Sequence, residues 1–224
     1  PSLLRYNGRN CPIYGLLLKP GSITVPDDRN KIQELENHTE KMEGIKMKKC
    51  AFTGHRPQSL PFGLNESDER CIHLKGKLRE EIIRLVDEQK VFHFITGMAI
   101  GVDMYAAEIV LELKAGCYPG IRLECAIPCE EQASKWTEKQ RDRYFDIVSR
   151  CDQETLVQRH YSSDCFDRRN RYMVDQADYL IAVWNGRPSG TGKTVRYARQ
   201  TGKPVIVIDP VHLHSHRENM GVPG

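Results

Sequence analysis

The stretch VFHFITGMAIGVDMYAAEIVLELKAG, residues 91–116, decides the fold of this chain. Its first six residues are mostly β-branched or aromatic, which indicates a buried strand. A loop with two glycines follows, and the apolar residues beyond it recur at three- and four-residue steps: Val102, Ala106, Ile109, Val110 and Leu113. This spacing predicts a helix that ends at Gly116. A strand, a glycine-bearing loop and a helix, in that order, form the repeating unit of an α/β sheet.

The same unit recurs on both sides of this stretch. Short β-rich runs predict strands at 48–53, 91–96, 121–127, 154–158, 179–184 and 204–209. Helical periodicity between them predicts further helices at 71–89, 137–149, 168–176 and 193–200. Strands that alternate with helices are joined by right-handed crossovers and lie parallel. The fold class is therefore expected to be α/β, a Rossmann-like open, mostly parallel sheet with helices on both faces.

The ends of the chain differ from this alternating body. Residues 1–46 hold a short apolar run at 13–18, which predicts an edge strand, and a highly charged segment at 27–44, which predicts a solvated helix or linker. We interpret 1–46 as an N-terminal extension or the remnant of another domain. Met47 stands directly before the first strand of the body. We therefore expect one domain over residues 47–210 and a C-terminal tail over 211–224.

The composition limits the classes of partner that we expect the protein to bind. The 224 residues include 33 basic and 30 acidic side chains, a formal net charge of +3 with no dense basic patch. This balance argues against a nucleic-acid partner. No apolar run approaches the roughly 18 residues of a membrane span, so we expect no membrane partner and a cytoplasmic location. The composition leaves open whether the protein forms a homo-oligomer.

Cysteines and histidines give little reason to expect a metal. None of the eight cysteines forms a CxxC pair. Three histidines alternate near the C-terminus: His212, His214 and His216. Their spacing would allow them to bind a metal ion, but a loose polar tail is the simpler interpretation. We therefore predict no metal site.

Glycine-bearing loops follow three of the predicted strands, at residues 53–57, 96–103 and 185–194. Ligands of open parallel sheets bind outside the carboxyl ends of the strands. Glycine lets the backbone approach a ligand, and helix N-termini present free N–H groups to a phosphate. Arginine and hydroxyl side chains add donors. We predict these ligand-binding residues: Thr53, Gly54, His55, Arg56, Gly97, Gly101, Asp103, Arg169, Asn170, Ser189, Gly190, Thr191 and Thr194.

Other interpretations of the same residues remain open. Turns between strands and helices need glycine for tight geometry even without a ligand. The run RPSGTGKT, residues 187–194, lacks the first glycine of a phosphate-binding P-loop, and GMAIGVD is not the dinucleotide fingerprint GxGxxG. Asp103 suits a helix N-terminus, where a carboxylate favours the macrodipole. Glu108 falls within the apolar period of its helix, so Asp103 and Glu108 are the candidate catalytic carboxylates.

Five segments of the sequence resemble those of a known protein family. The segments CAFTGHRP, FITGMAIGVDMYAAE, YPGIRLECAIPC with EQASKW, RNRYMVDQADYLIAVW and SGTGKT together resemble the YpsA-like proteins over residues 48–210. Those proteins belong to the SLOG superfamily of Rossmann-like folds, with the LOG phosphoribohydrolases and the DNA-processing protein A family. The resemblance implies binding of a nucleotide or an ADP-ribose-like ligand. It places Gly97, Gly101, Asp103, Gly190 and Thr191 on the binding loops.

The resemblance also bears on catalysis. LOG enzymes carry a PGGxGTxxE loop whose glutamate helps to cleave an N-glycosidic bond. Aligned on Gly190-Thr191, this chain has Thr194 in place of the glutamate. The first hypothesis is therefore a module that binds or senses a nucleotide-derived ligand. The alternatives are a hydrolase of a nucleotide N-glycosidic bond and a DNA-associated protein related to DNA-processing protein A.

Overall fold

The computed structural model describes residues 47–218, all of which belong to the compact unit Met47–Gly224. The strand expected at 13–18 and the charged segment at 27–44 lie outside the described residues. No helix within 47–218 is long and apolar enough to span a membrane.

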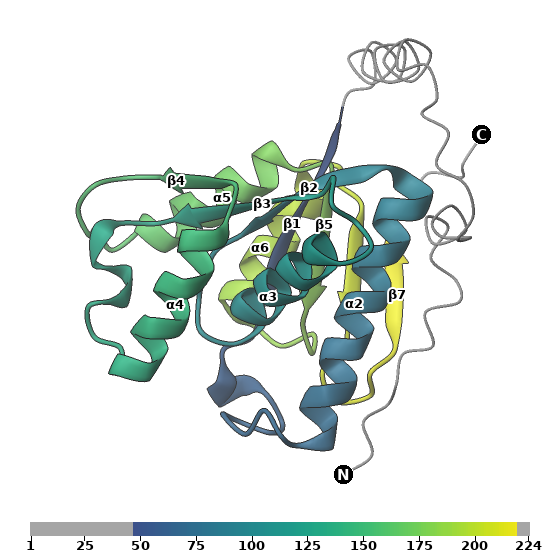
Figure 1. Ribbon diagram of the computed structural model, residues 1–224, viewed down its shortest axis with the longest axis horizontal. Coiled ribbons are helices and arrows are strands. Elements are labelled where there is room, and N and C mark those ends of the chain that lie inside the picture. Colours follow the sequence, from purple (N-terminus) through teal and green to yellow (C-terminus); the bar gives the residue numbers. More distant parts are fainter. Residues whose placement is uncertain (1–46, 219–224) are drawn as a thin grey trace, which may run out of the picture. The chain divides into compact units, whose positions relative to one another are not determined.

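The described part of the chain is built on one seven-stranded sheet with the order β4-β3-β2-β1-β5-β6-β7 (Figure 1). The strands are β1 (Lys48–Gly54), β2 (Val91–Thr96), β3 (Arg122–Ile127), β4 (Gln153–Leu156), β5 (Tyr179–Val183), β6 (Val205–Ile208) and β7 (Ser215–Glu218). All pairings are parallel except that of β6 with β7. The chain runs outward from β1 to β4 and then returns to the other side of β1 with β5. This order confirms the expected Rossmann-like sheet.

Helices cover both faces of the sheet (Figure 1). The helices are α2 (Glu69–Gln89), α3 (Val102–Ala115), α4 (Glu138–Arg150), α5 (Cys165–Gln176) and α6 (Gly190–Gln200). The first three share one buried cluster with the sheet, and the last two share another. Successive strand residues point to opposite faces, so Phe52 joins the first cluster and its neighbour Ala51 the second. Phe52 and Phe94 stack in the first cluster with centroids 5.8 Å apart.

Capping side chains explain where the helices begin. Asp68 accepts the Arg70 N–H ahead of α2, and Thr137 with Gln140 forms a capping box at α4. Ser189 caps α6 by accepting the Gly192 N–H, so this helix begins at Gly190, three residues before the predicted start. The sequence GTGK favours a loop by composition, and the serine cap overrides that preference.

The last strand corrects the expected C-terminal tail. Ser215–Glu218 forms β7, antiparallel to β6, so the sheet continues past residue 210. Polar contacts hold this strand: Arg199 pairs with Glu218 at 2.7 Å, and Ser215 and Arg217 reach Glu81 on α2 at 2.7 and 2.9 Å. The segment SHRE lacks the apolar alternation of a half-buried strand, which is why its pattern predicted a tail.

Candidate functional site

The strand order creates a crevice beside β1, where the chain leaves β1 and β5 in opposite directions along the sheet. A cavity of about 300 Å³ lies there, at the carboxyl ends of β1, β2 and β5, as expected for this class of sheet. We call it the switch-point cavity. Most of the predicted ligand residues line it: Thr53, Gly54, His55, Arg56, Asp103, Arg169, Asn170, Ser189, Gly190 and Thr191. Gln58, Ser59, Ala99 and Phe166 complete the lining.

Three of the predicted glycines have a packing role. A Cβ atom on Gly54 would overlap the Val102 side chain at the start of α3. A Cβ atom on Gly97 would overlap the guanidinium of Arg169 and lie 2.8 Å from Asp103 Oδ2. Gly101 has φ +102 and would bring a Cβ to 2.9 Å from the His55 carbonyl oxygen. Gly97 and Gly101 therefore shape the walls of the cavity without lining it.

Gly190 is different, because nothing in the fold requires it to be glycine. It has no positive φ, and a Cβ atom built on it meets no atom of residues 47–218 within 4 Å. It is the first residue of α6, where backbone N–H groups lack partners within the helix. The Thr191 hydroxyl beside it forms no hydrogen bond to any residue of the described range 47–218. The start of α6 thus combines open space with free donors for an anion.

Two arginines place positive charge in the cavity. Within residues 47–218 the Arg56 side chain forms no ion pair and no hydrogen bond, and its Cζ lies 5.8 Å from the centroid of Phe166. Arg169 is 4% exposed and is held in place by bonds from Nη1 to the Gly97 carbonyl and from Nε to Asn170 Oδ1. Of the two arginines that line this cavity within residues 47–218, Arg56 is therefore the one whose charge is free to meet a ligand.

One carboxyl group, that of Asp103, lies among these donors. Its Oδ2 accepts the Ala99 N–H at 3.3 Å and lies 3.9 Å from Arg169 Nη1. Burial raises the pKa of Asp103 above its ordinary value, against the attraction of Arg169 and Arg56. The cavity thus holds a group suited to hydrogen bonding with a sugar hydroxyl or to proton transfer.

His55 joins the switch-point cavity to a larger neighbour. Its Nε2 lies 3.0 Å from Asn185 Oδ1, and burial lowers the pKa of the imidazole, which favours the neutral ring. The neighbouring cavity, of about 660 Å³, shares His55, Gln58, Ser59 and Ser189 with the first. It extends to the carboxyl end of β6 at Asp209 and His212.

The structure does not bring Glu108 to the switch-point cavity. Its two carboxylate oxygens accept bonds of 2.7 Å from Nε and Nη2 of Arg143, whose guanidinium also contacts Glu66. Glu108 lines a different cavity, between α2 and α3. An apolar period identifies the face of a helix but not the end of the sheet to which a residue belongs. Of the two candidate carboxylates, only Asp103 lies with the predicted ligand residues.

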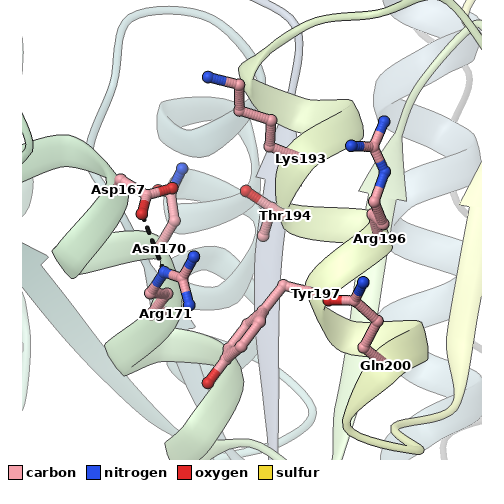
Figure 2. A pocket seen from close by; sticks show the side chains of 8 residues that line it. All are labelled: Asp167, Asn170, Arg171, Lys193, Thr194, Arg196, Tyr197 and Gln200. Carbon is pink, nitrogen blue, oxygen red and sulfur yellow. Dashed lines mark hydrogen bonds and ion pairs between the residues drawn. The ribbon is translucent and has the colours of Figure 1, made fainter.

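Thr194 lies in a groove between α5 and α6 that the sequence analysis missed (Figure 2). Its hydroxyl donates to the Gly190 carbonyl at 3.2 Å. The groove holds about 420 Å³, and within 47–218 its Lys193 and Arg196 form no ion pair. Asn170 lines both this groove and the switch-point cavity. The basic residues three positions apart on α6 were the signal in the sequence.

Residues 50–212 match the model of the YpsA family, described as the YspA SLOG family. The chain belongs to this family. The match begins within β1 at residue 50, spans β2 to β6 and includes all the lining residues of the switch-point cavity. The resemblance stated for the five sequence segments is thereby confirmed.

Relatives of this YpsA-family chain are found among bacilli. It is 29% identical over 177 residues to a UPF0398 protein of Bacillus pumilus, covering 77% of this chain and 93% of the relative. It is 27% identical over 170 residues to the UPF0398 protein YpsA of Bacillus subtilis, covering 72% and 92%. A UPF0398 protein of Bacillus cereus is 30% identical over 161 residues, covering 70% and 85%.

Solved structures of DNA processing protein A (DprA) resemble the fold of this YpsA-family chain. The Streptococcus pneumoniae protein has 17% identity and a TM-score of 0.48, covering 73% of this chain and 51% of that one. The Helicobacter pylori protein has 20% identity and a TM-score of 0.49, covering 72% and 65%. The chain thus spans about half to two thirds of these neighbours.

These neighbours correct the expectation that argued against a nucleic-acid partner. That expectation is withdrawn: the Helicobacter pylori structure is described by its single-stranded DNA binding mode, which is stated of that protein. It rested on the net charge of +3, which sums over the whole chain. A sum conceals local clusters such as Lys193 and Arg196 in the α5–α6 groove.

Proposed function

We propose that the protein is a binding or sensing module whose switch-point cavity holds the phosphate of a nucleotide or an ADP-ribose-like ligand. One observation carries this proposal: the unpaired guanidinium of Arg56 and the open space at Gly190 line the same cavity. A phosphate there meets a full positive charge, the N–H groups at the start of α6 and the Thr191 hydroxyl.

The size of the cavity supports a small ligand. About 300 Å³ stands at the lower end of the range for small-molecule sites, roughly 300 to 1,000 Å³. The adjoining cavity of about 660 Å³ shares four residues with the first, so a ligand longer than a mononucleotide has room to continue past His55. The Asp103 carboxyl group offers an acceptor for a ribose hydroxyl beside the phosphate donors.

The test is a thermal-shift and calorimetric titration with inorganic phosphate, AMP and ADP-ribose. We expect at least one nucleotide to stabilise the protein by about 2.7 kcal/mol at a hundredfold excess over its Kd. Arg56→Met should abolish this effect. Arg159→Met is the matched control, since Arg159 is exposed and lies outside the cavity. Absence of stabilisation by all three compounds, or equal binding by Arg56→Met, would refute the proposal.

A second candidate function is binding of single-stranded nucleic acid along the α5–α6 groove. Asn170 belongs to both the groove and the cavity, so successive phosphates of one strand could meet Arg56 in the cavity and Lys193 and Arg196 in the groove. Phosphate contacts make such binding salt-dependent. The double variant Lys193→Gln, Arg196→Gln should weaken oligonucleotide binding and lower its salt slope while leaving AMP binding intact. An unchanged slope would remove the groove from this candidate function.

A further inference from the structure

A group of metal-ligating side chains lies where β6 turns into β7. Asp209 follows β6 directly, and His212 and His214 belong to the turn before β7. One ligand atom of each lies within 4.8 Å of the others, and residues 47–218 hold no other such group. One carboxylate oxygen with two imidazole nitrogens is the donor set of many open zinc sites and of the two-histidine, one-carboxylate sites of other transition metals. The alternating pattern of these histidines in the sequence indicates only a polar tail, whereas the fold brings two of them to Asp209.

The backbone of the turn brings these side chains together. The Asp209 N–H donates to the His214 carbonyl at 3.0 Å, and the Leu213 N–H donates to the Asp209 carbonyl at 2.9 Å. Asp209 Oδ1 accepts the N–H groups of Val211 and His212 at 2.7 and 3.1 Å. Oδ2 remains 3.2 Å from His212 Nδ1. The three Cα atoms are therefore fixed before any ion arrives, and binding requires mainly side-chain rotation.

The exposure of the group suits an ion that enters from solvent and keeps an open position. The side chain of His212 is 71% exposed and that of Asp209 is 22% exposed. Three protein ligands leave at least one coordination position for water or another oxygen donor. Asp209 and His212 also line the cavity of about 660 Å³ that shares His55 and Ser189 with the switch-point cavity. An oxyanion in this cavity is thus a candidate for the open position.

We propose that Asp209, His212 and His214 form a binding site for a divalent transition-metal ion of the zinc class at the rim of this cavity. The two imidazoles select against Mg²⁺ and Ca²⁺, which prefer all-oxygen sites. His216 is not part of the site. It lies in β7, with its Nε2 3.2 Å from Glu218 Oε1 and its ring centroid 6.4 Å from that of His214. It therefore provides a histidine control from the same alternating run.

The test is calorimetric titration of the tag-free, full-length, metal-stripped chain with ZnCl₂. We expect one Zn²⁺ per chain. His212→Ala and His214→Ala should each weaken binding at least about a hundredfold, since loss of even an outer hydrogen-bond partner of a ligand costs about 10- to 100-fold. His216→Ala should keep the affinity within about twofold, and all three metal-free variants should melt like the parent because these three residues are exposed.

A spectroscopic measurement distinguishes a metal site with defined ligands from weak binding to scattered surface histidines. The Co²⁺-loaded chain should show the intense visible absorption of a low-coordinate nitrogen and oxygen site, which His212→Ala abolishes and His216→Ala retains. Three results would overturn the proposal: a Co²⁺ spectrum that resembles the hydrated ion, equal losses in His212→Ala and His216→Ala, or several weak Zn²⁺ ions per chain. Because no nucleotide is present, failure of this test leaves the phosphate site of the switch-point cavity unaffected.

Discussion

The main chain of Gly97 lies directly against the guanidinium of Arg169. The Gly97 carbonyl accepts a hydrogen bond from Nη1, and a Cβ atom on Gly97 would overlap both Nη1 and Cζ. This contact joins the loop after β2 to helix α5. The same guanidinium faces the Asp103 carboxylate at 3.9 Å, so the pair depends on the absence of a side chain at residue 97.

Gly97→Ala should therefore destabilise the protein strongly. The added methyl group displaces a buried arginine from its carbonyl and carboxylate partners, at a cost of about 3 kcal/mol. Urea unfolding measures this loss. Gly76→Ala is the control, because Gly76 is exposed within α2 and no atom of the part of the chain that the structure describes lies within 4 Å of an added Cβ. Alanine there should stabilise by up to about 1 kcal/mol. Equal stability of both variants would contradict the packing role of Gly97.

Gly190→Ala should separate binding from folding. The new methyl group meets no atom of the described residues within 4 Å and occupies the space that we assign to a phosphate. The melting temperature without ligand should stay equal or rise slightly, since alanine is the better helix former. The stabilisation by AMP or ADP-ribose should disappear. If the variant binds these nucleotides like the parent, the open space at the start of α6 is not the phosphate site.

Thr191→Val should weaken nucleotide binding by about 1.5–3 kcal/mol, the worth of a hydrogen bond to a charged group. The substitution keeps the shape of the side chain and removes a hydroxyl that has no partner within 47–218. Calorimetry gives the affinity of both forms. Thr194→Val is the matched control on the same helix, because its hydroxyl donates to Gly190 and lines the α5–α6 groove. A loss of affinity only in the control would place the ligand in that groove.

Incubation with AMP should release little free adenine. The position aligned with the LOG glutamate holds Thr194, whose hydroxyl is engaged with the Gly190 carbonyl. Chromatography of the products measures release, and a rate of order 1 per second would establish the hydrolase alternative. In that case Asp103→Asn should abolish release, while Glu108→Gln should not, because Glu108 pairs with Arg143 in another cavity.

Glu124 should make the stability of the protein depend on acid pH. This buried carboxylate accepts bonds of 2.7 Å from Tyr172 and 2.9 Å from Thr155, and it lies 2.8 Å from His93 Nε2. Burial works to raise the pKa of Glu124, but these three partners outweigh it and hold the pKa below the usual 4.5. The stabilisation is thus present above the unfolded-state pKa and is lost as pH falls through the lower folded-state pKa.

The comparison of the parent with Glu124→Gln isolates this contribution. Urea unfolding at pH 7 should show the variant less stable by about 1.5–3 kcal/mol, and the difference should shrink as the pH falls below about 4.5. A difference that stays constant between pH 7 and pH 3 would exclude Glu124 from the acid dependence.

Periodicity predicted most of the fold because the buried strands and amphipathic helices leave clear patterns, as at residues 91–116. The strand β7 was not predicted, because its residues are polar and partly exposed and its partners, such as Glu81, are distant in sequence. Glycine-bearing loops at strand ends pointed to residues that line the switch-point cavity. The packing role of Gly97 and the open space at Gly190 could not be predicted from the sequence, because the two glycines differ only in their three-dimensional neighbours.

The position of β1 at the centre of the sheet sets the order in which the cavity is assembled. The Lys49 N–H on β1 donates to Asp178 across 129 residues, whereas β1 and β2 are joined through the single α-helix α2. Such distant pairing carries a high loop-closure cost and forms slowly. During synthesis the segment from β1 to β4 emerges first, and of the cavity wall it carries only Thr53, Gly54, His55, Arg56, Gln58, Ser59, Ala99 and Asp103. The nascent chain therefore gains a complete pocket only after β5 and α6 dock. Ligand binding thus indicates that the domain has folded completely.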